Sequence, residues 1–402
     1  MQTLLACPVC AGKSITLLAQ LKDYPFTEKI APLGVTPSRT EFTSDQALLI
    51  CQVCSHGFLE NQYDPKLLYH SDYQTVSAKS EPASAATKRL LSFADSVLPL
   101  AEIEMVFDVG ANDGTLLHQT GGFGFQGLKV ALDPSVSDWQ EGIIGHTSFI
   151  EDFDFSLLPQ VKGARLIIAS HVLEHVADPV AVVSRLASEM TKDDLLVLQF
   201  PALEPLIMEK RFDQVHQQHF HYFTWTSFTR LLEEVNLEVV SSRVDWIHYG
   251  AGNVALKKVD GVKESRQSKS LPWGDPSLAG FSDIRDKVSL DAYADYLRFQ
   301  QVIDSSLAVK PYVALGAGLM SPIVFYYLPQ SWKNCEAIFD QDTAKVGVRY
   351  ANTPKSISLV PDVLTGINVL VSGSVSRGAG RKLFELAANK DARSINFPVL
   401  NA

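Results

Sequence analysis

Four of the five cysteines form two pairs with the same spacing. Cys7 and Cys10 are separated by two residues, as are Cys51 and Cys54, while Cys335 stands alone. A two-residue spacer lets both sulfurs of a pair reach one ion, and two pairs complete a tetrahedral thiolate site that suits Zn²⁺. Because four sulfurs leave no ligand position open, we predict a structural zinc. Two disulfides and a redox dithiol are the alternatives, and the cytosolic character of the chain and the duplicated motif disfavour them.

A second group of candidate residues surrounds a glycine-containing turn at residues 107–116. Gly110 allows a sharp turn, and Gly114 allows the next helix to approach a ligand closely. The acids in the turn suit an ammonium group and hydroxyls better than a pyrophosphate, and Asp133 is placed to accept from both hydroxyls of a ribose. An acid and a ring then follow at residues 152–153, where they suit an adenine. The predicted cofactor residues are Asp108, Gly110, Asn112, Gly114, Thr115, Leu116, Asp133, Asp152, Phe153 and Ser170.

Histidines are concentrated in one part of the chain, where six of the ten lie between residues 171 and 248. Imidazole titrates in the pH range that is useful for proton abstraction, so this concentration indicates a catalytic role. A metal site formed by His216, His219 and His221 is the alternative. The absence of a strong carboxylate ligand among these three residues disfavours it.

Short apolar runs must position these groups. Four runs of four to six residues, separated by helical patterns, predict a doubly wound parallel sheet with its ligand at the carboxyl ends of the strands: 105–109, 129–132, 166–169 and 195–200. A later set, the first of which precedes a glycine turn, predicts a smaller second α/β domain: 312–315, 337–339 and 369–372. The predicted organisation is a zinc-binding module (1–75), a cofactor-binding core (76–260), a linker and long helix (261–308), and a C-terminal Rossmann-like domain (309–402).

The composition excludes several classes of protein. The chain has 402 residues, of which 46% are hydrophobic, and this is enough apolar material for more than one core. A net charge of -10 argues against binding to nucleic acid or to anionic lipid, because such binding needs clustered basic residues. No apolar run approaches the ~20 residues of a membrane helix, and the N-terminus lacks the features of a signal peptide. We therefore predict a cytoplasmic monomer or homodimer that acts on a small molecule.

The turn, Asp133, Asp152 and the strand-end sequence from Ser170 to His175 together resemble a class I S-adenosylmethionine-dependent methyltransferase. Segment 212–223 and the order of the modules resemble, over nearly the full chain, the sugar C-methyltransferases of deoxysugar biosynthesis, which methylate a carbon of a nucleotide-linked keto-sugar. That resemblance implies zinc on the four cysteines and S-adenosylmethionine in the core. It also implies a nucleotide-sugar between the core and the C-terminal domain.

The resemblance further implies that His219 is a general base and that His175 is the strand-end histidine of the family. The family motif has Tyr, His and Glu where this chain has His216, Gln217 and Gln218. His216 or Gln218 would then donate to a developing oxyanion, while His175 would orient or relay the proton. Predicted substrate contacts are Tyr73, Tyr222, Phe223, His248 and Asn253.

The altered motif leaves other reactions open. O- or N-methylation, or a non-methyl reaction that uses the same cofactor, is one alternative. A zinc-module binding protein with an inactive core is another, which the joint presence of Asp108, Gly110, Asp133 and His219 disfavours.

Overall fold

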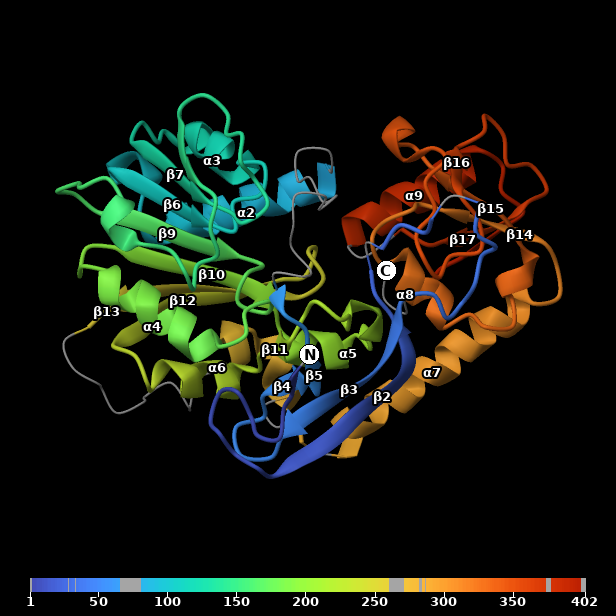
Figure 1. Ribbon diagram of the computed structural model, residues 1–402, viewed down its shortest axis with the longest axis horizontal. Coiled ribbons are helices and arrows are strands. Elements are labelled where there is room, and N and C mark those ends of the chain that lie inside the picture. Colours follow the sequence, from blue (N-terminus) through green and yellow to red (C-terminus); the bar gives the residue numbers. More distant parts are fainter. Residues whose placement is uncertain are drawn as a thin grey trace.

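A computed structural model describes residues 2–27, 29–32, 34–65, 81–259, 271–281, 284–285, 287–373 and 377–398. An N-terminal antiparallel sheet lies along one side of two α/β units, which occupy the two ends of the molecule (Figure 1). Within these residues, no helix is both long enough and apolar enough to span a bilayer.

The chain between the two cysteine pairs forms a long antiparallel hairpin. The hairpin belongs to a four-stranded sheet with the order β11 (His221–Tyr222), β4 (Gly57–Leu59), β3 (Thr43–Cys51) and β2 (Ile15–Pro25). A separate pair of short strands lies at its side, β1 (Gln2–Thr3) and β5 (Asn61–Gln62). Because β11 comes from the centre of the chain, the N-terminal sheet is completed by residues of the predicted core.

The central sheet has seven strands, and the four predicted runs are its middle strands. The order is β12 (Leu237–Asp245), β13 (Ala251–Lys258), β10 (Leu195–Pro201), β9 (Arg165–Ser170), β6 (Met105–Val109), β7 (Leu128–Leu132) and β8 (Ile143–His146). A parallel sheet was predicted, but strand β13 runs antiparallel to both of its neighbours, so the sheet is mixed. The helices of this unit are α2 (Glu81–Val97), α3 (Thr115–Gln119), α4 (Pro179–Glu189), α5 (Leu203–Met208) and α6 (Trp225–Leu232).

The C-terminal unit contains a five-stranded sheet in which all pairs are parallel. The order is β16 (Ile357–Leu359), β15 (Cys335–Asp340), β14 (Tyr312–Leu315), β17 (Asn368–Val371) and β18 (Ser394–Asn396). The predicted long helix, α7 (Lys287–Leu307), leads from the central unit to this sheet (Figure 1). Two further helices complete the unit, α8 (Ser321–Tyr326) and α9 (Arg377–Asn389).

Part of the stretch that was predicted as a polar linker packs into the central core. Trp273 has no exposed surface, and its ring lies against Phe200 and Trp225 at centroid distances of 5.6 and 5.3 Å. Its indole Nε1 donates to a carboxylate oxygen of Glu204 over 3.0 Å. One buried aromatic residue thus attaches this segment to the central unit.

One hydrophobic cluster joins the hairpin to both α/β units. It contains Leu21 of β2, Ile50 of β3, Leu203 of α5, Tyr296 of α7 and Ile323 of α8, all at most 2% exposed. Burying apolar surface from every part of the chain in one cluster opposes independent movement of the parts.

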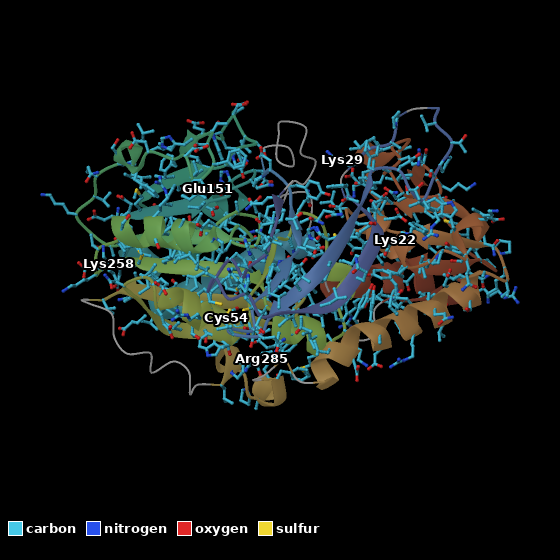
Figure 2. The ribbon with its side chains drawn as sticks, turned by 60° about the horizontal axis from the view of Figure 1, so that its bottom comes forward. Lys22, Lys29, Cys54, Glu151, Lys258 and Arg285 are labelled. Atoms are coloured by element: carbon cyan, nitrogen blue, oxygen red, sulfur yellow. The ribbon has the colours of Figure 1, made fainter. Side chains whose placement is uncertain are left out.

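The loop of the hairpin also contacts the C-terminal unit through polar groups. Arg349 pairs with Glu41 at an Nη1–Oε2 distance of 3.1 Å, and the arginine side chain is only 7% exposed. The hydroxyl of Tyr326 donates to the carbonyl of Lys22 over 3.0 Å, while at the other end Arg285 donates to the carbonyl of Gln52 over 2.7 Å. Figure 2 shows Lys22 beside the C-terminal unit and Arg285 near Cys54. The hairpin therefore extends from the cysteines to the C-terminal unit.

Candidate active site and cysteine cluster

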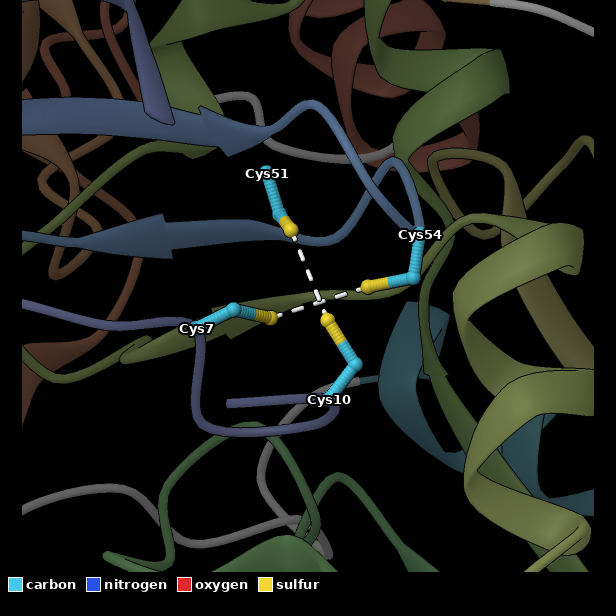
Figure 3. Close-up of side chains that lie close together, drawn as sticks. All are labelled: Cys7, Cys10, Cys51 and Cys54. Atoms are coloured by element: carbon cyan, nitrogen blue, oxygen red, sulfur yellow. Dashed lines mark hydrogen bonds between the residues drawn. The ribbon is translucent and has the colours of Figure 1, made fainter. Parts of the chain in front are cut away.

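The four paired cysteines converge on one point at the base of the hairpin (Figure 3). Their sulfur atoms lie within 4.8 Å of one another, with Cys7–Cys54 and Cys10–Cys51 separations of 3.6 and 3.5 Å. None of them forms a disulfide. A tetrahedral ion with Zn–S bonds of about 2.3 Å holds its sulfurs about 3.8 Å apart, so the spacing fits zinc. Without an ion, the thiols are shifted in opposite directions: a hydrogen bond with Cys54 lowers the pKa of Cys7 to about 6, whereas burial raises that of Cys10 to about 11.

The turn after β6 is formed by glycines in conformations that other residues avoid. Gly110 has φ +72°, and its amide donates to the carbonyl of Leu132 over 2.7 Å. A Cβ atom on Gly110 would lie 2.5 Å from Cγ2 of Val172. Gly114 has φ +77° at the start of α3, where a Cβ would lie 2.8 Å from Ile143. The backbone thus passes closely over the carboxyl ends of the strands, as a ligand cradle requires.

Two buried carboxyl groups border this turn. Asp133 accepts hydrogen bonds from the backbone amides of Asn112 and Ser135, both over 2.8 Å. Asp108 is 2% exposed, and burial together with the nearby Asp133 and Asp113 raises its pKa well above the ordinary value. A cationic ligand would stabilise the charged form of a carboxyl group whose pKa is raised in this way. These groups therefore fit the ammonium and ribose of an adenosyl amino acid.

The other predicted cofactor residues have different surroundings. Thr115 begins α3 and donates its amide to Asp113 over 3.1 Å, while Leu116 is 7% exposed in the core under the turn. Asp152 is exposed and bonds through its amide to Phe149. The ring of Phe153 is 3% exposed and stacks on Phe107, which leaves little of it for contact with an adenine.

A chain of amide and hydroxyl groups crosses the carboxyl ends of β9 and β10. The hydroxyl of Ser170 donates to Gln199 over 2.8 Å, and the amide nitrogen of Gln199 donates to Asn253 over 2.7 Å. Asn253 has no exposed surface, and its own amide nitrogen has no hydrogen-bond partner among the described residues. An unsatisfied buried donor is costly, so this nitrogen marks a position where a ligand oxygen would be stabilised.

Three predicted histidines meet in one cluster, in which His216 and His219 are buried and His175 is half-buried. The rings of His175 and His219 lie 4.7 Å apart, and those of His216 and His219 lie 3.7 Å apart. His175 Nδ1 bonds to the carbonyl of Gln218 over 2.8 Å. Burial lowers the pKa of His216 to about 3, lowers that of His175, and lowers that of His219 well below 6.5. All three imidazoles are therefore neutral at neutral pH and present lone pairs.

His248 joins a second pair next to this cluster. Its Nε2 lies 3.1 Å from Nε2 of His171, whose Nδ1 lies 2.8 Å from a carboxylate oxygen of Glu174. Burial and the adjacent His171 lower the pKa of His248 well below its ordinary value. The predicted substrate residue His248 is thus connected to the strand-end segment 171–175.

Residues 79–242 match the family described as methyltransferase domain. This part of the chain is therefore similar to a methyltransferase domain. Among curated proteins, the chain is 22% identical over 212 residues to C-methyltransferase NovU from Streptomyces niveus, a match that covers 51% of this chain and 49% of that protein. The chain thus spans about half the length of this curated relative.

Solved methyltransferase structures also match part of the chain. Magnesium protoporphyrin IX methyltransferase (ChlM) from Synechocystis PCC 6803 with bound SAH has 15% identity and a TM-score of 0.34, and covers 49% of this chain and 94% of that chain. Mitomycin 7-O-methyltransferase MmcR has 16% identity and a TM-score of 0.32, and covers 43% and 54% respectively.

The altered motif of the methyltransferase domain lies against the N-terminal hairpin. Gln218 accepts a hydrogen bond from the hydroxyl of Thr27 over 3.1 Å, and Gln217 accepts one from the amide of Gln46 over 2.9 Å. The two glutamines therefore link the hairpin to the domain. The side-chain oxygen of Gln218 thus bonds to the hairpin and its backbone oxygen bonds to His175, whereas the predicted donation to an oxyanion would use its amide nitrogen.

The aromatic residues predicted to contact substrate are buried in the methyltransferase domain. Tyr222 has no exposed surface, and its hydroxyl accepts from the amide of His216 over 3.2 Å. Phe223 packs in the core against Phe200 and Phe228 at centroid distances of 4.8 and 6.3 Å. Tyr73 lies outside the described residues. Tyr222 therefore holds the backbone of the histidine segment through a hydrogen bond, and Phe223 is part of the hydrophobic core.

The structure also brings an unpredicted residue into the cluster. Glu174 has no exposed surface, and one of its carboxylate oxygens lies within 4.8 Å of ligand atoms of His175 and His219. The signal was present in the sequence, because Glu174 lies between His171 and His175 directly after an apolar run. A carboxylate close to a histidine favours the charged imidazolium and so raises the pKa of that histidine.

Proposed function

We propose that this protein is an S-adenosylmethionine-dependent methyltransferase. When bound, this cofactor supplies a methyl group already activated on a sulfonium. The observation that carries the proposal is the turn between Gly110 and Gly114, whose close backbone approach and buried acids Asp108 and Asp133 fit a cationic adenosyl amino acid. The family match over residues 79–242 supports the same conclusion.

The proposed acceptor is a carbon beside a keto group in a nucleotide-activated deoxysugar. The sequence similarity to a C-methyltransferase supports attack by carbon, and the resemblance of the full module order to sugar C-methyltransferases supports the substrate class. The C-terminal unit, held by the hairpin, would contribute to the binding of the nucleotide. O- or N-methylation of a related metabolite is the alternative, which the substituted residues His216, Gln217 and Gln218 keep open.

In the proposed reaction, His219 removes the α-proton of the acceptor. Its neutral imidazole provides the necessary lone pair, and His175 fixes the direction of that ring through their 4.7 Å contact. His216, whose ring lies 3.7 Å from that of His219, would donate to the enolate oxygen. The buried surroundings exclude water, which protects the enolate from reprotonation.

The four cysteines would hold a structural Zn²⁺ that closes the base of the hairpin. Four thiolates saturate the ion, so it would take no part in the reaction. Its contribution would be to fold the hairpin that contacts both Gln217 and Gln218.

Two measurements test the proposal. Calorimetry should show binding of S-adenosylhomocysteine and none of a nicotinamide dinucleotide; the reverse result would refute the cofactor assignment. Incubation with ¹³C-methyl-labelled cofactor and a panel of nucleotide-linked keto-sugars should then give a product with a carbon-attached methyl group by two-dimensional NMR. A methyl group on oxygen or nitrogen would establish the alternative instead.

Proton abstraction can be followed separately. In D₂O, the intact protein should exchange the α-proton of the keto-sugar, and His219→Ala should slow this exchange by about 100-fold or more. Exchange at the same rate in both proteins would exclude His219 as the base. His118→Ala is the matched control, since His118 lies on α3, outside the cluster.

A further inference from the structure

Glu174 is a buried acid to which the proposed function gives no role. It lies in the turn after β9 and has no exposed surface. One carboxylate oxygen lies 2.8 Å from Nδ1 of His171, and the other has no hydrogen-bond partner among the described residues. Its backbone carbonyl accepts the amides of Phe220 and His221 over 2.7 and 3.3 Å. Glu174 therefore contacts both the strand-end segment and the chain that carries the proposed base.

The side chain of His175 lies close to both Glu174 and the proposed base. Its Nδ1 bonds to the carbonyl of Gln218, so this nitrogen carries the proton and Nε2 carries the lone pair. His175 Nε2 lies 4.0 Å from a carboxylate oxygen of Glu174. One ligand atom each of Glu174, His175 and His219 lies within 4.8 Å of the other two. A charge on Glu174 thus acts on both imidazoles at short range, with little water between them.

The cluster needs a negative charge to work as a base. Burial and the other histidines lower the pKa of His219, because each of them disfavours an imidazolium. Position 218 holds Gln218, whose side chain carries no charge. Glu174 is the carboxylate that the fold places beside His175 and His219 within the described part of the chain. Its proximity raises the pKa of His175, whereas burial and His171 lower it.

We propose that Glu174 is the positioning residue whose carboxylate stabilises the imidazolium formed in the His175–His219 pair during the reaction; this rests on the proposed function. The proton leaves the acceptor carbon for the imidazole, and the electron pair of the broken C–H bond stays on the acceptor as the enolate. Glu174 keeps its charge and takes no proton, as the aspartate of a catalytic triad does. Among the described residues, other titratable groups that face the cluster are His171, His216, His221, His248, Tyr222, Tyr249 and Asp178.

The decisive variant is Glu174→Gln, which keeps the shape and removes the charge. Its kcat should fall by about 10- to 100-fold while the affinity for S-adenosylhomocysteine is unchanged. Removing a carboxylate lowers the pKa of the adjacent base, so the acidic limb of the kcat profile should move to lower pH by about one unit or more. Glu189→Gln, an exposed acid at the end of α4, is the matched control and should leave both quantities unchanged. A fall in kcat without movement of the acidic limb would show a merely structural role and overturn the proposal.

A second measurement separates this proposal from the proposed function. Nitrogen-15 NMR of the histidines, with S-adenosylhomocysteine and no acceptor, should show a lower pKa for His175 in Glu174→Gln than in the intact protein. Equal values would overturn the proposal even if a sugar is methylated, whereas failure to methylate any sugar would overturn only the proposed function. If Glu174→Gln does not fold, Glu174→Asp can be used instead, because it keeps the charge. The acidic limb of its kcat profile should lie at the same pH as in the intact protein. A shift of that limb to lower pH by about one unit would overturn the proposal.

Metal analysis excludes a different role for the same atoms. Glu174, His175 and His219 also have a spacing that an ion could bridge. The proposal requires one metal ion per chain, on the four cysteines, in both the intact protein and Glu174→Gln. Two ions in the intact protein, with one lost in the variant, would show that Glu174 is a metal ligand and would overturn the proposal.

Discussion

Replacing Gly110 with alanine should destabilise the central unit and weaken binding of the cofactor product. The left-handed conformation at φ +72° costs a residue with a Cβ about 1–2 kcal/mol. The added Cβ would also lie 2.5 Å from Cγ2 of Val172, a contact that must be relieved by local movement at about 1–3 kcal/mol. The two effects together predict a loss of about 2–5 kcal/mol in the free energy of unfolding.

Chemical denaturation and calorimetry with S-adenosylhomocysteine would measure the two consequences. Gly121→Ala is the matched control, because its Cβ would meet nothing within 4 Å and its φ is not positive. Adding Val172→Ala to Gly110→Ala should recover the steric part alone, which leaves about 1–2 kcal/mol of backbone strain. If Gly110→Ala matched Gly121→Ala in both stability and affinity, the assignment of this turn as the cofactor cradle would be refuted.

Three further predictions concern the acids and the cysteines. Asp133→Asn should weaken binding of S-adenosylhomocysteine by about 10- to 100-fold, because hydrogen bonds to a charged group contribute about 1.5–3 kcal/mol. The control Asp154→Asn changes an exposed acid and should leave the affinity unchanged. Equal affinities of the two variants would contradict the ribose role of Asp133. Cys54→Ser should lower the zinc content below one ion per chain and lower the Tm, and Cys335→Ser should retain the zinc; unchanged metal content in Cys54→Ser would exclude the site. Burial raises the pKa of Glu204 from 4.5 to about 7, so its proton is bound more tightly in the folded state and stability falls as pH rises from 4.5 to 7. Relative to Glu204→Gln, the intact protein should therefore lose about 3 kcal/mol between pH 4 and pH 8, and a constant difference in denaturation experiments would show that this carboxyl group does not titrate abnormally.

The sequence was most informative where local chemistry determines local structure. The run Met105–Val109 became β6 with the predicted bounds, because a short, wholly buried strand consists mainly of apolar residues, with Asp108 as the exception here. The edge strand Ile143–His146 was missed, since it is half exposed and contains a glycine. The direction of β13 also depends on its two neighbours in the sheet rather than on its own residues.

The candidate site was predictable in part for the same reason. Gly110 and Asp133 lie at strand ends, so their meeting follows from the parallel sheet. The bond from Thr27 to Gln218 joins residues 191 positions apart, and no local pattern indicates it. The burial of Trp273 among Phe200 and Trp225 likewise depends on a surface that forms only after the sheet has folded.

Strand β11 belongs to the central part of the chain but pairs with β4 of the N-terminal sheet, so neither part can be exchanged alone during evolution. His221 pairs with Phe58 across two segments that are far apart in the chain, and the amide of Leu59 bonds to the carbonyl of Phe220 over 3.0 Å. A transplanted methyltransferase domain would leave these backbone groups without partners unless the hairpin were exchanged with it. The N-terminal hairpin and the segment that carries the histidines therefore form one heritable unit, and recombination between related chains should preserve them together.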